Sequence, residues 1–502
     1  MNRYKKLGIL LSVLVVVCAA TLLLSRYEEK QEQIRTSDAI ILEIPTDTVT
    51  ALSWEYDGGG SLAFHKEEGL WRYDEDADFP VSEKKVNDIL SHFEAFGVSF
   101  LIENVEDYGQ YGLDQPECTL HISTEEASYD IRLGDYSKMD EQRYVDIGDG
   151  NVYLVREDPM DYVDAALSGM IENDDTPGFE TVTDIRFAGA QDYTIQRLED
   201  SGCSYSENDV YFISQNGNYL PLDTSAVTKY LNTITSLDLS GYVTYHATDE
   251  ELAAFGLDSP ELSVTVSYTN TDEDSGEPVS GTCVLHISRN PEEVKAAREA
   301  EEKGENAKTV SMYVRVGDSR IVYPLDSVDY GILSAASYND LRHKEVFWAD
   351  WEDVTRMEIT LEGKTHTMTS EPGKEDTRIW HYHEETLPED TGEPAEETEP
   401  AEETEPAEET EPAEESLDLS DFRDALLALR ADSFTDEAPG AQEELRLTLR
   451  LDNENFPETE IVLYRYDGSG CLAQVDGETV SLVPRASVMK LVEAVQAIVL
   501  NG

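Results

Sequence analysis

The chain has 502 residues, and its 106 aspartates and glutamates against 37 lysines and arginines give a formal net charge of −69. So large a negative charge repels phosphate backbones and anionic lipid surfaces, and it therefore argues against nucleic-acid binding. The acidity favours solubility for an exported chain, with diffuse cation binding as the weaker interpretation.

The chain begins with a segment that predicts a membrane anchor. Residues 7–24 are eighteen residues without a charge, and a helix of that length spans ~27 Å of the ~30 Å hydrocarbon core of a bilayer. Basic residues without any acid precede the segment, at Arg3, Lys5 and Lys6, and mixed charges follow it. This asymmetry predicts that residues 1–6 are cytoplasmic and that the C-terminal part is extracytoplasmic.

Two kinds of processing are alternatives to a retained anchor. Signal peptidase could cut near Ala20, and a lipid could be attached at Cys18. However, the apolar run continues beyond Ala20, and Val17 is too large for the residue before a lipidated cysteine. We therefore expect an uncleaved single-pass protein of the cell membrane, with a juxtamembrane linker at residues 25–42 and about three domains of ~150 residues after it.

Four cysteines follow the apolar segment, and they show neither CxxC pairs nor dense spacing: Cys118, Cys203, Cys283 and Cys471. This pattern is not that of a disulfide scaffold. Three of the four lie in apolar or small-residue surroundings typical of buried thiols. Only Cys203 and Cys283 could pair within one domain, and the free thiols are the favoured interpretation.

A repeated seven-residue segment points to internal duplication. Tyr111–Glu117 (YGLDQPE) matches Phe255–Glu261 (FGLDSPE), and alternating strand-like residues follow each copy. In the second copy, Thr248 and Glu251 predict a capping box and Gly256 a left-handed residue that ends a short helix. The motif is therefore interpreted as a helix stop before a strand and not as a catalytic loop.

Two further features recur along the chain. Hairpins with Gly/Asp turns are expected at residues 144–153 and 313–323, with a weaker third at 472–480. Amphipathic helices are indicated by apolar residues at spacings of three and four. Their apolar faces are Val86, Ile89, Leu90 and Phe93; Val227, Tyr230, Leu231 and Ile234; and Phe422, Ala425, Leu426 and Leu429.

Strands are predicted on both sides of each amphipathic helix. Those before the helices are Leu52–Tyr56, Ser61–His65, Leu70–Tyr73, Asp184–Phe187, Tyr193–Leu198, Val210–Ile213, Val354–Leu361, Thr365–Thr369 and Ile379–Tyr382. A short helix is expected to close each unit, near Met160–Leu167, Val328–Ala336 and Ala486–Leu500. The sequence thus predicts an α+β fold, with an N-terminal transmembrane helix followed by three related domains of antiparallel sheet with packed helices, at residues 43–170, 181–340 and 346–502.

Two charged segments interrupt these predicted domains. Residues 389–416 repeat Ala-Glu-Glu-Thr-Glu-Pro, and their charge, proline and lack of large apolar residues predict a disordered acidic insertion inside the third domain. A long flexible excursion is tolerable there because the cost of loop closure rises only as the logarithm of length. Residues 291–308 form a second charged insertion, expected to be an exposed helical hairpin arm.

The sequence shows none of the motifs that mark phosphate loops, zinc proteases, nucleophile elbows or paired metal-binding cysteines. His381 and His383 would lie on one side of a strand, but two ligands do not make a metal site, and outward-facing polar positions are the favoured interpretation. Asp146, Asp149 and Asn151 lack the spacing of a calcium loop and suit a turn. We therefore predict no catalytic, cofactor-binding or metal-binding residues, and no cofactor.

The aromatic residues have two interpretations. The chain has 26 tyrosines and 5 tryptophans, which would suit stacking against cell-wall sugars. However, four tryptophans fall in or beside predicted strands where each unit needs core residues, and core packing is favoured for them. They are Trp54, Trp71, Trp348 and Trp380.

Several of these features together resemble the bacterial family called domain of unknown function 4340. They are the strand Val49–Trp54, the strand Gly69–Tyr73, the helix Val86–Phe93 and the segment Tyr111–Pro116. The resemblance covers most of residues 43–337, and the third unit lacks the GLDxP segment. It implies a membrane-anchored envelope protein, since some members are associated with ABC-type transporters of the kind linked to gliding motility, and it carries over no catalytic residue.

We therefore expect a non-enzymatic, extracytoplasmic accessory or binding component of an ABC-type transporter or envelope complex. Its expected partner is a transporter permease or another envelope protein. The alternative is a cell-surface protein that mediates adhesion or binds wall polysaccharide. An envelope hydrolase is less favoured, because no nucleophile–base or paired-carboxylate constellation emerges from the sequence.

Overall fold

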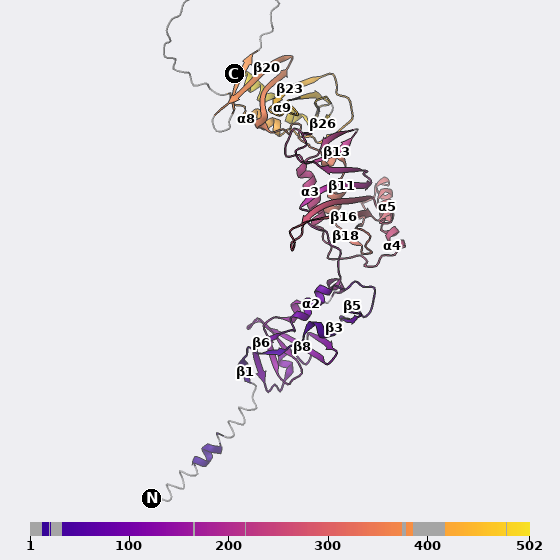
Figure 1. Ribbon diagram of the computed structural model, residues 1–502, viewed down its shortest axis with the longest axis vertical. Coiled ribbons are helices and arrows are strands. Elements are labelled where there is room, and N and C mark those ends of the chain that lie inside the picture. The colour runs from indigo at the N-terminus through magenta and orange to yellow at the C-terminus, as the bar shows by residue number, and fades with distance from the viewer. Residues whose placement is uncertain are drawn as a thin grey trace, which may run out of the picture. The chain divides into compact units, whose positions relative to one another are not determined.

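A computed structural model gives the fold of the chain (Figure 1). The described residues are 13–19, 21, 33–163, 166–215, 217–373, 378–384, 417–477 and 479–501. The chain divides into two compact units, each built from several segments. Unit 1 contains residues up to 175 together with 238–259 and 289–324, and unit 2 contains residues 176–237, 260–288 and 325–502.

The predicted anchor, residues 7–24, is described only at residues 13–19 and 21, which are helical. The remainder of the anchor lies outside the described residues. Within the described part of the chain, no helix combines the length and the apolar character needed to cross a bilayer. The acidic insertion at residues 389–416 also lies outside the described residues.

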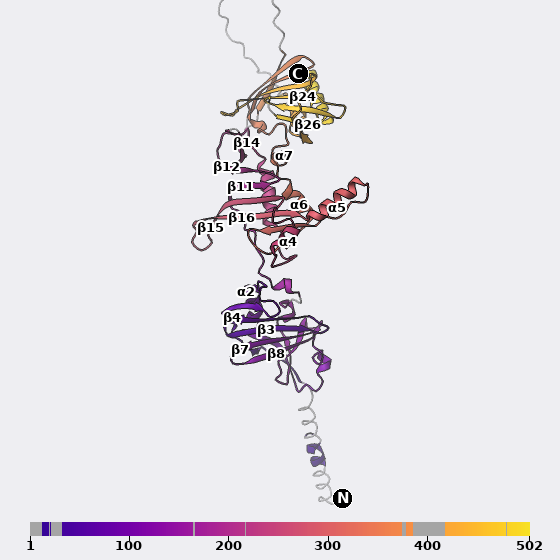
Figure 2. The same cartoon turned by 90° about the vertical axis from the view of Figure 1, so that its right-hand side faces the viewer.

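The first sheet lies in unit 1 and has ten antiparallel strands. Their order is β1-β6-β10-β9-β8-β7-β3-β4-β5, with β2 also paired to β6. Figure 2 shows β4, β3, β7 and β8 side by side in this order. The strands are β1 (Gln33–Thr36), β2 (Ile40–Leu42), β3 (Val49–Tyr56), β4 (Ser61–Glu67), β5 (Leu70–Tyr73), β6 (Phe96–Glu103), β7 (Cys118–Thr124), β8 (Ser128–Ser137), β9 (Gln142–Asp146) and β10 (Val152–Val155).

The second and third sheets are also antiparallel. Within unit 2 the strands of the second sheet run in the order β14-β13-β12-β11-β15-β16, formed by β11 (Thr181–Gly189), β12 (Tyr193–Arg197), β13 (Tyr211–Gln215), β14 (Asn218–Pro221), β15 (Leu262–Thr271) and β16 (Pro278–Arg289). Two short strands follow in the chain, β17 (Met312–Val316) and β18 (Tyr323–Leu325). The third sheet has the order β21-β20-β19-β23-β24-β25-β26-β22, formed by β19 (Val354–Leu361), β20 (Lys364–Pro372), β21 (Arg378–Glu384), β22 (Ser433–Phe434), β23 (Glu443–Leu451), β24 (Glu458–Arg465), β25 (Gly470–Val475) and β26 (Thr479–Pro484).

The three sheets share one order of strands. In each, consecutive strands form an antiparallel meander, a helix follows, and a strand after that helix pairs with the first strand of the meander: β7 with β3, β15 with β11, and β23 with β19. The register shifts at the same place in all three pairings, just after a buried valine. The residue at each bulge is a threonine, namely Thr50, Thr183 and Thr355.

The amphipathic helices form where their apolar spacing predicts them. They are α2 (Glu83–Ser91), α3 (Thr224–Thr235) and α8 (Ser420–Leu427). The side chain of Ser82 accepts a hydrogen bond from Lys85 N at the start of α2, and that of Asp223 accepts from Ser225 N and Ala226 N at the start of α3. Each buried Val, Leu or Ile side chain contributes about 1.5–3 kcal/mol to stability, so these apolar faces hold the helices in place.

Each of the three predicted domains is expected to end in a short helix. This prediction is confirmed for the second and third domains and wrong for the first. Helices α6 (Ser327–Ser334) and α9 (Arg485–Asn501) form. The described part of 160–167 contains no α-helix, and two 3₁₀ turns, η3 (Pro159–Asp161) and η4 (Leu167–Met170), flank it. The carboxylate of Asp158 caps Met160 N, but a segment of about two turns is too short to offset the cost of forming the first helical turn.

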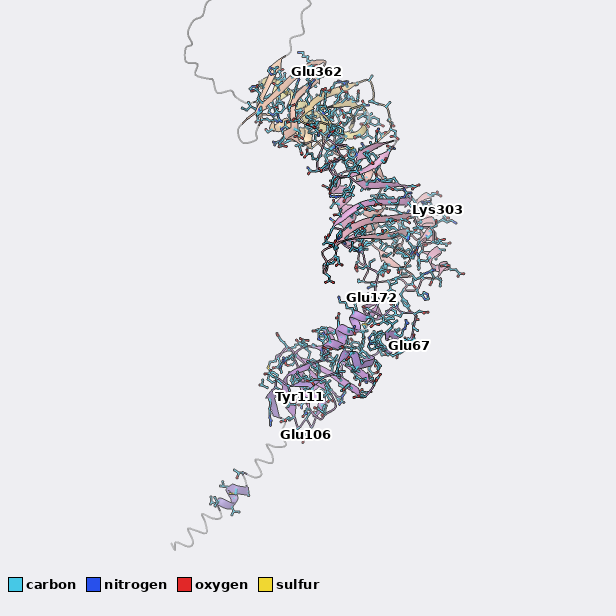
Figure 3. All side chains as sticks on the ribbon, viewed as in Figure 1. Glu67, Glu106, Tyr111, Glu172, Lys303 and Glu362 are labelled. Carbon is cyan, nitrogen blue, oxygen red and sulfur yellow. The ribbon has the colours of Figure 1, made fainter. Side chains whose placement is uncertain are left out.

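The repeated GLDxP segment has the predicted conformation. Helix α4 (Asp249–Ala254) carries the capping box, and Gly112 and Gly256 have φ of 69° and 75°. The aromatic residue that precedes each of these two glycines packs on the first tyrosine of a predicted hairpin, and all four aromatic residues lie in unit 1. Tyr111 (labelled in Figure 3) lies 4.9 Å from Tyr144, and Phe255 lies 4.8 Å from Tyr313, between ring centroids.

The charged segment 291–308 differs in part from the expected helical hairpin. Helix α5 (Pro291–Glu302) forms, but residues 303–311 return without helix. Ser311 N donates to Glu293 Oε2 at 2.6 Å, so the return lies beside the start of α5. The turn between them uses Gly304 at a φ of 69°.

The core of the third sheet contains residues from β19–β21, β23–β26, α8 and α9, including Trp380 and Phe422 (Figure 1). Leu417 N donates to Trp380 O at 3.0 Å, so the chain resumes beside β21 after the acidic segment. Trp54, Trp71 and Trp380 are at most 5% exposed, which confirms the core prediction for them. Trp348 is only partly buried. No disulfide joins the four cysteines beyond residue 24, all of which the structure describes, and Cys118, Cys283 and Cys471 are buried as predicted.

Candidate functional site

A cavity of about 450 Å³ lies within unit 2. Its wall comes from the segment after β12, from β14, from α7 (Tyr338–Leu341), from the connection that follows α7, and from loops and strands of the third sheet. Aromatic side chains supply much of the lining: Tyr205, Tyr219, Tyr338, Trp348 and Phe456. The ring of Tyr205 packs on both Trp348 and Phe456, with centroids 5.1 and 4.7 Å apart.

A buried carboxylate contacts two of the side chains that line this cavity, Ser204 and His343. Asp209 is 6% exposed, and its Oδ2 lies 2.9 Å from His343 Nε2 and accepts a hydrogen bond from Ser204 Oγ at 2.5 Å. Trp348 Nε1 donates to Ser204 Oγ at 3.4 Å, and the Trp348 ring stacks on His343 with centroids 5.1 Å apart. Because an unpaired buried carboxylate is costly, these contacts hold His343 in one orientation.

The other face of His343 meets two more carboxylates. Its Nδ1 lies 4.0 Å from Glu345 Oε2. A carboxylate oxygen of Asp223, one nitrogen of His343 and one oxygen of Glu345 all lie within 4.8 Å of one another. Glu345 Oε1 pairs with Arg430, whereas its Oε2 is buried and has no hydrogen-bond partner.

The backbone fixes these residues from three elements. Asp223 N donates to Leu341 O at 3.0 Å, which ties the start of α3 to the end of α7. On both sides of Glu345 the chain pairs with the end of the α8 segment, through Val346 N to Leu429 O at 2.9 Å and Ala431 N to Lys344 O at 2.7 Å. The polar cluster therefore stands on fixed backbone and not on a free loop.

Arg342 adds a cation to the same wall. Its guanidinium lies over the rings of Tyr338 and Phe434, at 4.7 and 4.3 Å from their centroids. Burial lowers the pKa of Arg342, and the neighbouring Tyr338 opposes that shift. Stacking on aromatic faces suits a partly desolvated guanidinium.

A second cavity in unit 2, about 460 Å³, is lined mainly by acids and small polar residues. Asp353 lies in it together with Asp350, Asp452 and Glu207. Burial raises the pKa of Asp353, and the three neighbouring acids raise it further. The acids around Asp353 repel one another, whereas Asp209, which also lines this cavity, is paired with His343.

The residues weighed as metal ligands from sequence lie elsewhere. His383 Nε2 is 2.8 Å from Thr369 Oγ1 on the neighbouring strand, and its side chain is exposed. Asp146 pairs with Arg132 and accepts from Gly148 N at 2.8 Å, while Asp149 accepts from Asn151 N at 3.1 Å. These carboxylates make the hydrogen bonds of a turn.

Sequence reasoning did not single out Asp209, Asp223, His343 or Glu345. Asp209 and His343 are 134 residues apart, so only the tertiary fold brings them together. The one local signal is the alternation His343-Lys344-Glu345 just before the third predicted domain, which places two potential ligands on one side of an extended segment.

The fold and the cavity define an α+β protein with three antiparallel sheets of shared strand order. The chain belongs to the family described as domain of unknown function (DUF4340), which matches residues 71–210 and 214–453. The match reaches into the third sheet, beyond the range over which the sequence motifs resemble the family. No curated protein and no solved structure matches the chain.

Proposed function

We propose that this protein is a non-enzymatic, membrane-anchored extracytoplasmic binding protein, an accessory component of an ABC-type transporter or envelope complex. The observation that carries the binding role is the aromatic cavity of unit 2. Its volume of about 450 Å³ is within the ~300–1,000 Å³ typical of ligand sites. Rigid aromatic side chains such as Tyr205 and Trp348 are the groups that anchor partners at recognition sites.

The polar contacts in the cavity support binding over catalysis. Ser204 Oγ is bonded to Asp209 Oδ2, and His343 Nε2 reaches the same oxygen. A nucleophilic serine needs the imidazole as its own hydrogen-bond partner, with the carboxylate behind the imidazole. Here the carboxylate lies in the centre, so this trio orients His343 without activating Ser204.

The features shared by the three sheets also support binding over catalysis. They are a buried valine, a threonine at a bulge and a helix after the meander, and all of them serve the fold and not a reaction. Repetition of one structural motif along a chain is typical of proteins that present extended surfaces to partners. The net charge of −69 supports a protein or neutral polymer over an anionic surface as the partner.

Wall-polysaccharide binding is the second candidate, favoured by the aromatic lining itself. Sugar rings stack on aromatic faces, and Tyr219 and Phe456 line the same cavity. In that case the cavity would hold a glycan segment and not a protein side chain.

Affinity purification of the full-length protein from detergent-solubilised, cross-linked membranes separates the two. We expect a permease or another envelope protein to co-purify in stoichiometric amount, and the purified protein to stay in the supernatant when mixed with purified wall polymer. Sedimentation with the polymer without a protein partner would establish the second candidate and refute the first.

A further inference from the structure

We propose that Asp223, His343 and Glu345 bind one divalent transition-metal ion of the zinc class, at the wall of the aromatic cavity. The three donor atoms come within 4.8 Å of one another from two different parts of unit 2. Imidazole nitrogen with two carboxylate oxygens is a donor set that suits zinc and its neighbours, whereas calcium and magnesium prefer oxygen alone.

The hydrogen bond on the far side of the imidazole supports this assignment. Metal-binding histidines commonly donate their second ring N–H to a carboxylate, which fixes the tautomer and turns the other nitrogen toward the ion. His343 Nε2 faces Asp209 Oδ2 at 2.9 Å in this way. With the proton on Nε2, the lone pair is on Nδ1, which lies 4.0 Å from Glu345 Oε2.

Glu345 supplies a second, independent observation. Its Oε1 pairs with Arg430, but its Oε2 is buried, lacks a hydrogen-bond partner and faces His343 Nδ1 at 4.0 Å. A buried carboxylate oxygen without a partner carries a desolvation cost that a bound cation removes.

Charge balance agrees with a divalent ion. Asp209, Asp223 and Glu345 bring three carboxylates to His343, and Arg430 offsets one of them, while the guanidinium of Arg342 stacks on Tyr338 and Phe434. Because a metal-binding imidazole is unprotonated, two negative charges remain for one divalent cation to offset. Because Asp223 Oδ1 already caps α3 through Ser225 N at 2.9 Å, its other oxygen is the one left to bind the ion.

Binding requires a small closure of the site. Ligand atoms of tetrahedral zinc lie about 3.4 Å apart at bond lengths near 2.1 Å, against up to 4.8 Å here. Rotation of the Glu345 and Asp223 carboxylates closes this gap. Three protein ligands leave one position of a tetrahedral ion open.

The test is zinc binding by the chelator-stripped, full-length protein, measured by calorimetry in excess calcium and magnesium to saturate the diffuse acidic surface. Cobalt(II) absorption then reports coordination by an imidazole. We expect one saturable site per chain, weakened more than about 100-fold in His343→Asn and Glu345→Gln and about 10- to 100-fold in Asp209→Asn, the range typical of outer-shell partners.

His121→Asn is the matched control, since His121 Nδ1 also lies against a carboxylate, 2.6 Å from Asp130. This variant should bind zinc as the wild type does. Near-ultraviolet circular dichroism of the metal-free variants establishes that they fold. The absence of a saturable site, or equal losses in His343→Asn and His121→Asn, would overturn the proposal. NMR of the wild-type protein gives a further test. If His343 is an imidazolium and zinc does not change its signal, the proposal is overturned, because the cation between the carboxylates is then the His343 side chain itself.

Discussion

Thr183 Oγ1 donates a hydrogen bond to Ser267 O at 3.2 Å, across the bulge that joins β11 to β15. Thr50 and Thr355 make the same bond, also at 3.2 Å, to Ser123 O and Arg450 O. The extra residue of a bulge leaves backbone groups without ladder partners. In all three sheets the threonine at the bulge adds a side-chain hydrogen bond to the opposite strand.

Replacement of Thr355 by valine should therefore destabilise the third sheet by about 0.5–1.5 kcal/mol, the net contribution of one hydrogen bond. Thr360→Val is the matched control on the same strand, because Thr360 Oγ1 contacts only the hydroxyl of Thr365 across an exposed pair. Urea unfolding followed by tryptophan fluorescence measures both. Equal effects of the two substitutions would show that the bulge hydrogen bond has no special role.

Arg143 should be the most sensitive charged residue of the first sheet. Its side chain is 8% exposed and contacts Asp158 Oδ1 at 2.7 Å, Glu117 Oε2 at 2.6 Å and Gly134 O at 2.6 Å. Burial alone would lower the pKa of Arg143, but the hydrogen bonds and charges of these two acids raise it.

Arg143→Met leaves the mostly buried carboxylate of Asp158 without its guanidinium partner, which should cost about 3–5 kcal/mol. The control is Arg35→Met, since the Arg35–Glu103 pair is largely exposed and its loss should cost less than about 1 kcal/mol. Thermal unfolding of the two variants compares them. A small effect for Arg143→Met would mean that water replaces the guanidinium.

Asp353 should make stability depend on pH in the acid range. Its pKa is raised in the folded protein by burial and by Asp350, Asp452 and Glu207. The folded state therefore holds the proton more tightly than the unfolded state, so this contribution favours folding below the ordinary value of 3.8 and is lost as the pH rises through the folded pKa.

Asp353→Asn should consequently stabilise the protein at pH 7 by ~0.5 kcal/mol, the size typical of partly exposed charge interactions. The gain should disappear as the pH falls below 3.8. Glu352→Gln, at an exposed neighbour, is the control and should change stability little at either pH. Melting curves at both pH values measure this, and a gain that grows at low pH would reverse the assigned sign.

Alkylation should distinguish the cysteines by burial. Burial raises the pKa of Cys118 to about 12 and that of Cys471 to about 11, with Glu444 adding to the second shift. Cys203 is only partly buried and lines the aromatic cavity. Since the thiolate is the reactive form, iodoacetamide at pH 8 should modify Cys203 first among the four thiols beyond residue 24. Peptide mass spectrometry gives the order, and early labelling of Cys118 would contradict its burial.

The sequence predicts the sheets much better than the site. The bounds of Leu70–Tyr73 and Val354–Leu361 agree with β5 and β19 because alternating apolar residues fix a strand locally. The helix expected at 160–167 fails because periodicity over eight residues does not outweigh the cost of the first turn. Asp209 and His343 are brought together by the packing of β13, α3 and α7. A contact between such distant residues leaves no local pattern in the sequence.

In the proposed function, the aromatic cavity of unit 2 binds the partner. The Tyr219→Ala variant in the membrane co-purification experiment is the most direct test of this role. Tyr219 lines the cavity and is 41% exposed, so its removal should spare the fold. Tyr466, 44% exposed and outside the cavity lining, provides the matched Tyr466→Ala control. We predict that the partner is lost with Tyr219→Ala and retained with Tyr466→Ala. Retention of the partner by both folded variants would contradict the assignment of this cavity as the binding site.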